Sequence, residues 1–344
     1  MPGEWAKALH ARSVTLPGGV AFGPGALAGG AAFGQFNSAT ASGIGRLDPT
    51  SGKLTTIWSY SRGVSGMGGI QADRPWLVWE QLDSQTNLAD WSIHAWNLTT
   101  RTGSVLATSR LGDGSYVRGQ QPLPVVKNGV AAWAQPVPSP AGYVEAQIRV
   151  VNLSTHRQWT VDTGRVSSPV YAGPYLIWGK INRSGHYLFR AVDARSLKPV
   201  VLPRPLQHPG SMGYLAGSPT YLAWSTQDLT ALTVWPAGSA RSREFTASGP
   251  RHRFQFLQLA GHFVLWYNGA SSSVLDLRTG NGFDVQGTVT GSAAAITIAE
   301  PVTNPKTKST FVASRVSTIA MTAAPGISRC AQHGATARSE LAPP

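Results

Sequence analysis

The chain has 344 residues, with 29 Lys and Arg against 16 Asp and Glu, a net charge of +13, 12 Trp and a single cysteine, Cys330. A hydrophobic fraction of 42% is enough for a large core and excludes a wholly disordered chain. One cysteine excludes an internal disulfide framework and a thiolate-rich zinc site, and a charged fraction of 13% argues against coiled coils and long exposed helices.

Near the start of the chain, residues 20–33 form an apolar stretch that could suggest a targeting or membrane segment. Pro24 and four glycines interrupt it, so it suits neither a stable helix nor a membrane span. We expect no membrane span and no signal peptide, which makes a cytoplasmic location the default. An extracytoplasmic location stays open if the natural chain carries a leader that precedes these residues.

A short apolar run that ends in an aromatic residue recurs six times along the chain. Five runs end in Trp, at intervals of 54, 45, 46 and 42 residues, and the first ends in Phe, 46 residues before the first of these tryptophans. A period of about 40–50 residues is typical of a repeat fold. We interpret these aromatic residues as structural blade core: Phe33, Trp79, Trp133, Trp178, Trp224 and Trp266.

An extended segment closing in Asn or Asp and a polar turn follows most of the apolar runs, as in residues 93–100, 148–155 and 274–280. Asn and Asp suit a hairpin turn because their short side chains hydrogen-bond to the backbone two residues further on. Each unit therefore reads as four short strands, with the aromatic residue on the second. Four-stranded units of this length are typical of a β-propeller, in which the aromatic ring would pack between adjacent blades.

The predicted fold is all-β: a single β-propeller of four-stranded blades, with seven blades expected, six of them clearly marked, and six as the alternative count. Residues 289–322 would form the seventh blade, with strands at 293–299, 310–313 and 317–321. Closing the ring requires the two ends of the chain to meet, so we expect residues 13–22 to supply a strand to a terminal blade.

Three segments follow from this reading. Residues 1–12 would be an N-terminal extension, residues 13–324 the propeller, and residues 325–344 a disordered C-terminal tail without an apolar pattern. We expect a monomer.

One blade carries a family resemblance. Leu77-Val78-Trp79-Glu80, followed by Asp90-Trp91-Ser92-Ile93 and by Asn97-Leu98-Thr99-Thr100, resembles the repeat of TolB-type β-propellers. Those repeats commonly combine an apolar-Val-Trp-acid strand, an Asp-x-Asp-Ile-Tyr strand and an Asn-Leu-Thr-Thr-Gly turn. The resemblance implies the propeller fold and, more loosely, a binding role associated with a protein or the cell envelope, because propellers host many functions.

Motifs that carry catalytic chemistry are largely missing from the sequence. It contains no glycine-rich phosphate loop before a helix, no His-Glu-x-x-His and no Gly-x-Ser-x-Gly. The eight histidines are scattered, so we expect no metal site and no cofactor.

The longest insertions within repeats lie between the second and third strands of two neighbouring units, at residues 81–90 and 136–145. These loops should lie side by side on one face of the ring, with the preceding inter-blade connection between them, and long loops on a rigid scaffold are common binding sites. Glu80 belongs to the repeat itself and is interpreted as structural. The candidate ligand-binding residues are Asp83, Asp90, Trp91, Tyr116, Arg118, Tyr143 and Glu145.

Residues 101–344 carry the whole basic excess, since residues 1–100 hold equal numbers of basic and acidic side chains. One dense stretch has a single acid, Asp193, among Lys180, Arg183, Arg190, Arg195, Lys198 and Arg204. Such an excess favours an anionic partner, although it also suits an ordinary solvated surface. Residues 251–256 mix charges with aromatics as single-strand nucleic-acid binders do, or else form a strand that buries Phe254 and Phe256.

The function that these observations favour is a non-enzymatic binding or scaffold protein that recognises a protein or cell-envelope ligand through its loop-bearing face. The first alternative is a propeller lyase or glycoside hydrolase that uses carboxylates of the same loops. The second is binding of a polyanion or nucleic acid through the basic part of the chain.

Overall fold

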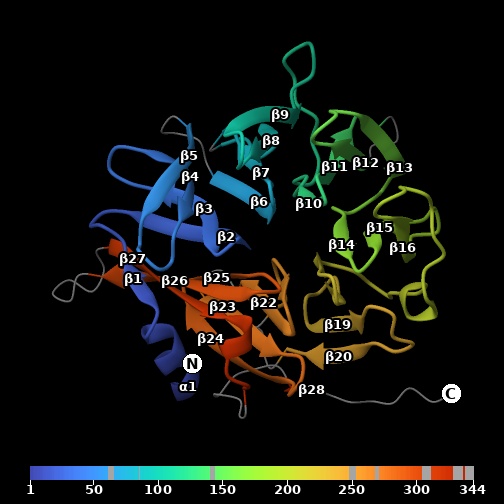
Figure 1. Cartoon of the computed structure of the whole chain (residues 1–344). Helices are drawn as coiled ribbons and strands as arrows, with labels where there is room; N and C mark the ends of the chain where they lie inside the picture. The colour runs from blue at the N-terminus through green and yellow to red at the C-terminus, as the bar shows by residue number, and fades with distance from the viewer. Residues whose placement is uncertain are drawn as a thin grey trace.

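Seven small antiparallel sheets form a ring in the computed structural model of the chain (Figure 1). The structure describes residues 1–60, 66–84, 86–139, 144–247, 253–267, 271–303, 311–327 and 336–337. For residues 311–313, 336 and 337 only the backbone is described. The predicted all-β propeller with seven blades is confirmed.

Blades 1 to 3 follow the four-strand pattern in chain order. Blade 1 consists of β2 (Ala21–Ala28), β3 (Ala31–Asn37), β4 (Ser42–Leu47) and β5 (Leu54–Tyr60). Blade 2 consists of β6 (Gly66–Asp73), β7 (Trp76–Leu82), β8 (Trp91–Asn97) and β9 (Thr102–Thr108). Blade 3 consists of β10 (Val125–Lys127), β11 (Val130–Val137), β12 (Glu145–Asn152) and β13 (Gln158–Gly164).

Blades 4 to 6 vary this pattern. Blade 4 has β14 (Val170–Ala172), β15 (Tyr175–Ile181) and β16 (Tyr187–Asp193), and a 3₁₀ helix η1 (Arg204–Leu206) follows it. Blade 5 has β17 (Leu215–Gly217), β18 (Tyr221–Ser225), β19 (Ala231–Pro236) and β20 (Arg243–Thr246), with β28 (Thr336–Ala337) added outside β20. Blade 6 has β21 (Gln258–Ala260), β22 (Phe263–Tyr267), β23 (Ser271–Asp276) and β24 (Asn281–Gln286).

Blade 7 joins the two ends of the chain. Its strands are β25 (Thr288–Gly291), β26 (Ala295–Thr303), β27 (Phe311–Ala320) and β1 (Ser13–Thr15), and η2 (Met321–Ala323) follows β27. In β1, Ser13, Val14 and Thr15 lie opposite residues 317, 316 and 315 of β27, so the N-terminal residues close the ring as expected. The separate fourth strand expected at 317–321 is wrong, because β27 runs unbroken through residue 320.

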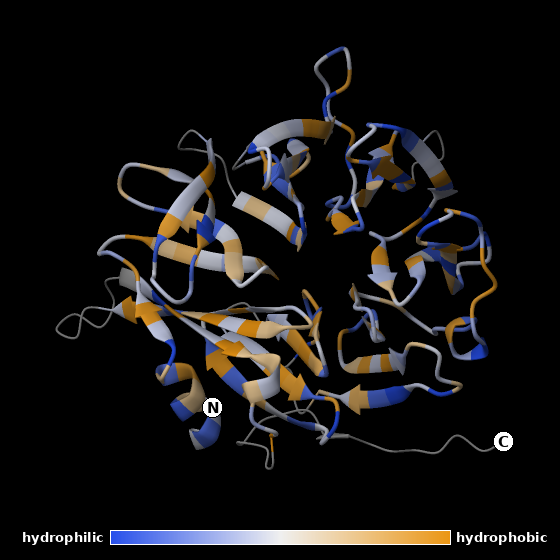
Figure 2. Ribbon diagram, viewed as in Figure 1, coloured by the Kyte–Doolittle hydropathy of each residue, from blue (hydrophilic) through white to orange (hydrophobic). Residues whose placement is uncertain are grey.

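Buried aromatic side chains mark the boundaries between blades. The repeated positions Phe33, Trp79, Trp133, Trp178, Trp224 and Trp266 are all buried. Trp133, for example, packs with residues of blade 2, and Trp178 packs with residues of blade 3. Figure 2 shows apolar segments along the strands and many hydrophilic connecting turns.

The residues before β1 form a helix, α1 (Gly3–His10), at the margin of blades 6 and 7 (Figure 1). Its Trp5 is fully buried in a cluster with residues of both blades, and the Trp5 Nε1 donates a hydrogen bond to the Pro325 carbonyl at 2.9 Å. Ile327 is buried in the same cluster. The segment limits 1–12, 13–324 and 325–344 stay predictions. No helix among the described residues is long and apolar enough to span a bilayer.

Blade 4 departs from the expected four strands, because its sheet contains only three. The chain that would form the fourth strand starts beside the C-terminal end of β16 and contains Pro199 and Pro203. It makes a single bridge, between Val192 and Pro199, and then turns toward blade 5.

Candidate functional site

In each blade, the second strand ends and the first strand begins on the same side of the ring. We call this side the loop-bearing face. It carries the connections at residues 83–90 and 109–124. Residues 138, 139 and 144, the described residues between β11 and β12, also lie on this face. The predicted loops and the intervening connection therefore lie on one face, around blades 2 and 3. We call this region the rim.

Asp90 is the centre of a hydrogen-bonded cluster in the rim. Its carboxylate accepts hydrogen bonds from Arg110 Nη2 at 2.9 Å, Arg110 Nε at 3.2 Å and Tyr116 Oη at 3.0 Å. The hydrogen bond to Asp90 raises the pKa of the Tyr116 hydroxyl, with burial as a smaller cause. Asp90 itself is buried, so this carboxylate fastens the connection after β9 to the loop before β8.

Asp83 is likewise occupied by its neighbours. It accepts hydrogen bonds from Gln81 Nε2 at 2.6 Å and Ser92 Oγ at 2.8 Å, and the Ser92 hydroxyl lies 2.9 Å from His94 Nε2. Burial lowers the pKa of His94, and the charge of Asp83 opposes this. The serine lies between the acid and the histidine, whereas a catalytic triad places the histidine in the middle. Ser92 and His94 are buried, whereas Asp83 is half-buried, and contact between Asp83 and a ligand stays a prediction.

The other predicted rim residues differ in accessibility. Arg118 is exposed, and Glu145 is half-buried at the start of β12. Trp91 is only 1% exposed and packs in the core between blades 2 and 3, and contact between Trp91 and a ligand stays a prediction. Tyr143 lies outside the described residues.

Glu80 is a buried carboxyl group on β7. Neither of its oxygens has a hydrogen-bond partner within the described part of the chain. Its Oε2 lies close above Gly68, where an added Cβ would come within 2.8 Å of it, and Leu123 adjoins the same glycine. Burial raises the pKa of Glu80 to about 8. Because the side chain is inaccessible, it cannot act on a ligand at the surface.

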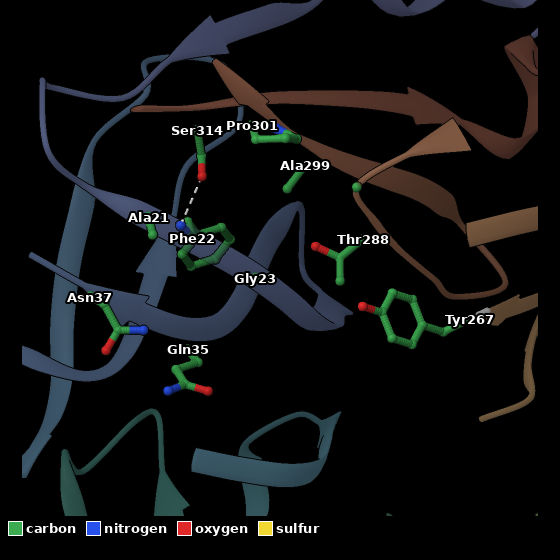
Figure 3. A pocket seen from close by; sticks show the side chains of 11 residues that line it. Ala21, Phe22, Gly23, Gln35, Asn37, Tyr267, Thr288, Ala299, Pro301 and Ser314 are labelled. Atoms are coloured by element: carbon green, nitrogen blue, oxygen red, sulfur yellow. Dashed lines mark hydrogen bonds between the residues drawn. The ribbon is translucent and has the colours of Figure 1, made fainter. Parts of the chain in front are cut away.

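A pocket of about 330 Å³ opens on the loop-bearing face where blades 7 and 1 meet (Figure 3). Its walls come from strand ends: the start of β2, the end of β3, the end of β22 and the start of β25. Gln35 and Asn37 line it on the blade 1 side, opposite Thr288 and Tyr267 (Figure 3). None of the described residues that line it has a charged side chain.

Two polar groups of the pocket are available to a ligand. The Asn37 amide and the Thr288 hydroxyl form no side-chain hydrogen bond to any described residue. Gln35 is partly used, because its Nε2 donates to Tyr60 Oη at 2.8 Å. The Ser314 hydroxyl accepts the backbone N–H of Phe22 at 3.0 Å and shapes the wall. The pocket thus combines uncharged donors and acceptors with the rings of Phe22 and Tyr267.

An aromatic row leads away from this pocket across blades 6 and 5. The ring of Phe256 lies 6.5 Å from that of Tyr267 and 5.0 Å from that of Tyr214. Phe256 is 50% exposed and has a φ of 48°, a backbone conformation that is unusual for a bulky residue. Phe254 is buried, as the strand alternative for this stretch predicts, whereas its expectation that Phe256 is buried is wrong. The positive φ reverses the strand-like alternation on which that expectation depended.

Sequence reasoning did not find the pocket, because its residues share no motif and come from opposite ends of the chain. Only ring closure brings residues 21–37 next to residues 287–301 and 314. Within the described residues, no group of three His, Cys, Asp or Glu side chains could hold a metal ion.

No protein-family model and no curated protein sequence matches the chain. Among solved structures, an oligogalacturonate lyase from Vibrio parahaemolyticus is similar over 89% of this chain and 96% of its own, at 9% identity and a TM-score of 0.55. A prolyl endopeptidase is similar over 87% of this chain and 47% of its own, at 11% identity and a TM-score of 0.51.

TolB from Acinetobacter baumannii is similar over 80% of this chain and 63% of its own, at 13% identity and a TM-score of 0.41. The chain thus spans less than two thirds of the TolB and prolyl endopeptidase chains. At such identities, the similarity to the lyase and the endopeptidase shows the fold alone: the chain is a seven-bladed β-propeller.

Proposed function

We propose that this protein is a non-enzymatic binding propeller, and that its loop-bearing face holds an uncharged polar ligand of the oligosaccharide class. The observation that carries this proposal is the pocket between blades 7 and 1, whose described lining residues are all uncharged. Oligosaccharides are among the cell-envelope ligands that the sequence leads us to expect.

The chemistry of the pocket suits a sugar. Amide and hydroxyl groups such as those of Asn37 and Thr288 can donate to and accept from sugar hydroxyls. Aromatic rings offer flat apolar surfaces against which the C–H face of a sugar ring packs. Tyr267 belongs to the pocket, and Phe256 and Tyr214 continue the aromatic surface beyond it. The volume falls within the range of about 300–1,000 Å³ that is usual for small-ligand sites.

The state of the carboxylates supports binding rather than turnover. A glycoside hydrolase needs two carboxyl groups that face its substrate. Asp83 and Asp90 each use both oxygens in hydrogen bonds within the rim, and Glu80 is buried. In the rim, the exposed Arg118 and the half-buried Glu145 are proposed as a further contact region on the same face.

Removing one polar group from the pocket tests the proposal. Thr288→Val keeps the side-chain shape and removes the hydroxyl, so we expect affinity for a bound oligosaccharide to fall about fivefold, as for one lost hydrogen bond. Tyr267→Ala should weaken binding about tenfold because it removes an aromatic contact. The probes are neutral hexasaccharides of β-1,4-linked glucose, α-1,4-linked glucose and β-1,4-linked N-acetylglucosamine. Binding is measured by saturation-transfer NMR and calorimetry.

Thr86→Val is the matched control, because Thr86 is exposed on the same face but in blade 2. It should leave affinity unchanged. Absence of binding for all three neutral probes would contradict the proposal, as would equal effects of the two Thr→Val changes. Oligogalacturonate is included as an anionic probe, and its cleavage would favour the lyase alternative.

A further inference from the structure

Blade 4 leaves one of its inner strands at the edge of the ring. In the other blades a further strand covers the third one, whereas β16 pairs only with β15. After the turn that follows β16, the chain forms backbone hydrogen bonds with β16 only at the C-terminal end of this strand. Asp193 N donates to Lys198 O at 2.9 Å, and Val200 N donates to Ala191 O at 3.2 Å. Leu202 and Leu206 then leave the edge and pack into the interface with blade 5.

The N-terminal half of β16 therefore has backbone N–H and C=O groups that no described strand pairs with. Alternate residues of an antiparallel strand direct their N–H and C=O groups to opposite sides. Ala191 and Asp193 bond to the segment outside the sheet, so Tyr187 and Phe189, at the same parity, also direct theirs outward. No described residue pairs with these groups. A partner strand of about four residues would match the length of this unpaired stretch.

A comparison with blade 3 shows what the missing strand would contact. Arg149 lies opposite Trp133 in blade 3, as Arg190 lies opposite Trp178 in blade 4. Arg149 Nη1 donates to Thr160 Oγ1 at 3.0 Å and its Nη2 donates to Gln158 Oε1 at 2.8 Å, both on the fourth strand β13. Arg190 is exposed and makes no such bond within the described residues, because blade 4 has no fourth strand.

The surroundings of this edge are strongly basic. Five exposed cations form no ion pair with any described residue: Arg183, Arg190, Arg195, Lys198 and Arg204. Asp193 is the one acid of the stretch. Its carboxylate accepts hydrogen bonds from the backbone N–H groups of Arg195 and Ser196 in the turn that follows β16. Val201, 90% exposed, adds an apolar contact beside the edge.

The neighbouring blade shows that an outer edge of this ring can take an additional strand. In blade 5, the chain's own β28 pairs with β20, with residues 336 and 337 opposite Thr246 and Phe245. Strand addition to a sheet edge supplies affinity through main-chain hydrogen bonds, and side chains supply the selectivity.

We propose that an extended acidic segment of a partner protein pairs with β16 and completes blade 4 as its missing fourth strand. Its carboxylates face Arg190 and the cations at both ends of the edge. This site is separate from the pocket between blades 7 and 1. A negative result for peptide binding therefore leaves the proposed oligosaccharide binding unaffected, and the reverse also holds.

The test uses a fluorescein-labelled eight-residue peptide of alternating Glu and Val, with binding followed by fluorescence anisotropy. Arg190→Glu should weaken binding about tenfold, because it replaces an attraction with a repulsion. Lys198→Glu should weaken it severalfold. The matched controls are Arg149→Glu for Arg190 and Lys53→Glu for Lys198. Lys53 is a close match because its carbonyl accepts from Asp48 N as that of Lys198 accepts from Asp193 N. Both controls should bind as the wild type does.

Two further measurements separate strand addition from general attraction. Bound peptide should slow hydrogen exchange of the Phe189 amide, and a peptide with alternate amides N-methylated should lose binding. Circular dichroism checks the fold, and Arg190→Gln serves as a milder variant. Equal binding of the N-methylated peptide, or of a Lys-Val peptide, would overturn the proposal. So would tighter binding of heparin or a single-stranded oligonucleotide that Arg190→Glu and Lys53→Glu weaken equally, since that shows a general polyanion surface.

Discussion

Glu80→Gln is expected to stabilise the protein, with a gain in the free energy of unfolding that grows as the pH rises from about 5 to about 8. Both oxygens of the buried carboxyl group lack partners among the described residues, so its charged form is poorly solvated in the folded protein. Burial accordingly raises the pKa of Glu80 from 4.5 to about 8. Glutamine has a similar shape and cannot ionise.

The sign of the pH effect follows from proton binding. Between pH 4.5 and about 8, the unfolded chain has lost the Glu80 proton that the folded protein keeps. Rising pH therefore favours unfolding of the wild type, by about 1.4 kcal/mol for each pH unit within this window. Above the window both states are ionised and the penalty is constant. Below it both are protonated and the penalty is absent.

Urea unfolding of both proteins at several pH values from 5 to 9 measures this difference. Other titrating groups cancel when the variant is compared with the wild type at each pH. Glu244→Gln removes an exposed carboxylate from β20 and should produce no comparable pH-dependent gain. A Glu80→Gln difference that stays constant across this range would mean that the folded protein stabilises the ionised Glu80 carboxylate.

The ring of blades could be predicted from the sequence because the same packing between neighbouring sheets is repeated in each blade. A large ring on the second strand fills the space between two sheets, so Trp recurs with the period of the blade. The Asx turns recur for a local reason, since Asn97 and Asn152 accept hydrogen bonds from the backbone two and three residues further on. Such features depend on near neighbours or on the repeat, and both are visible in a sequence.

The departures from the repeat were not predictable in the same way. Blade 4 has no fourth strand because the chain leaves β16 after one bridge at Pro199, and a proline does not signal this departure, since Pro24 lies within β2. The pocket depends on ring closure, and its polar residues are ordinary surface types. The rim acids were found, yet their roles follow from partners such as Arg110, which the sequence does not connect to Asp90.

Trp5→Ala is expected to lower the free energy of unfolding by about 3–5 kcal/mol, the usual cost of removing a large buried aromatic ring. The Trp5 ring lies 5.4 Å from that of Phe263 and 5.0 Å from that of Phe283, and it is fully buried. Trp5→Phe keeps part of this packing and loses the hydrogen bond to the Pro325 carbonyl, so its cost should be clearly smaller. Chemical unfolding measures both changes.

The expected cost has a second source in ring closure. β1 is only three residues long, and α1 leads directly into it, so the docked helix holds the closing strand in place. Trp5→Ala should therefore also speed hydrogen exchange at the β1 amides. Trp159→Ala is the control, because Trp159 lies half-buried on the outer strand of blade 3. If both Trp→Ala changes cost the same and β1 exchange is unaltered, α1 does not secure the closure and the ring is held by its strands alone.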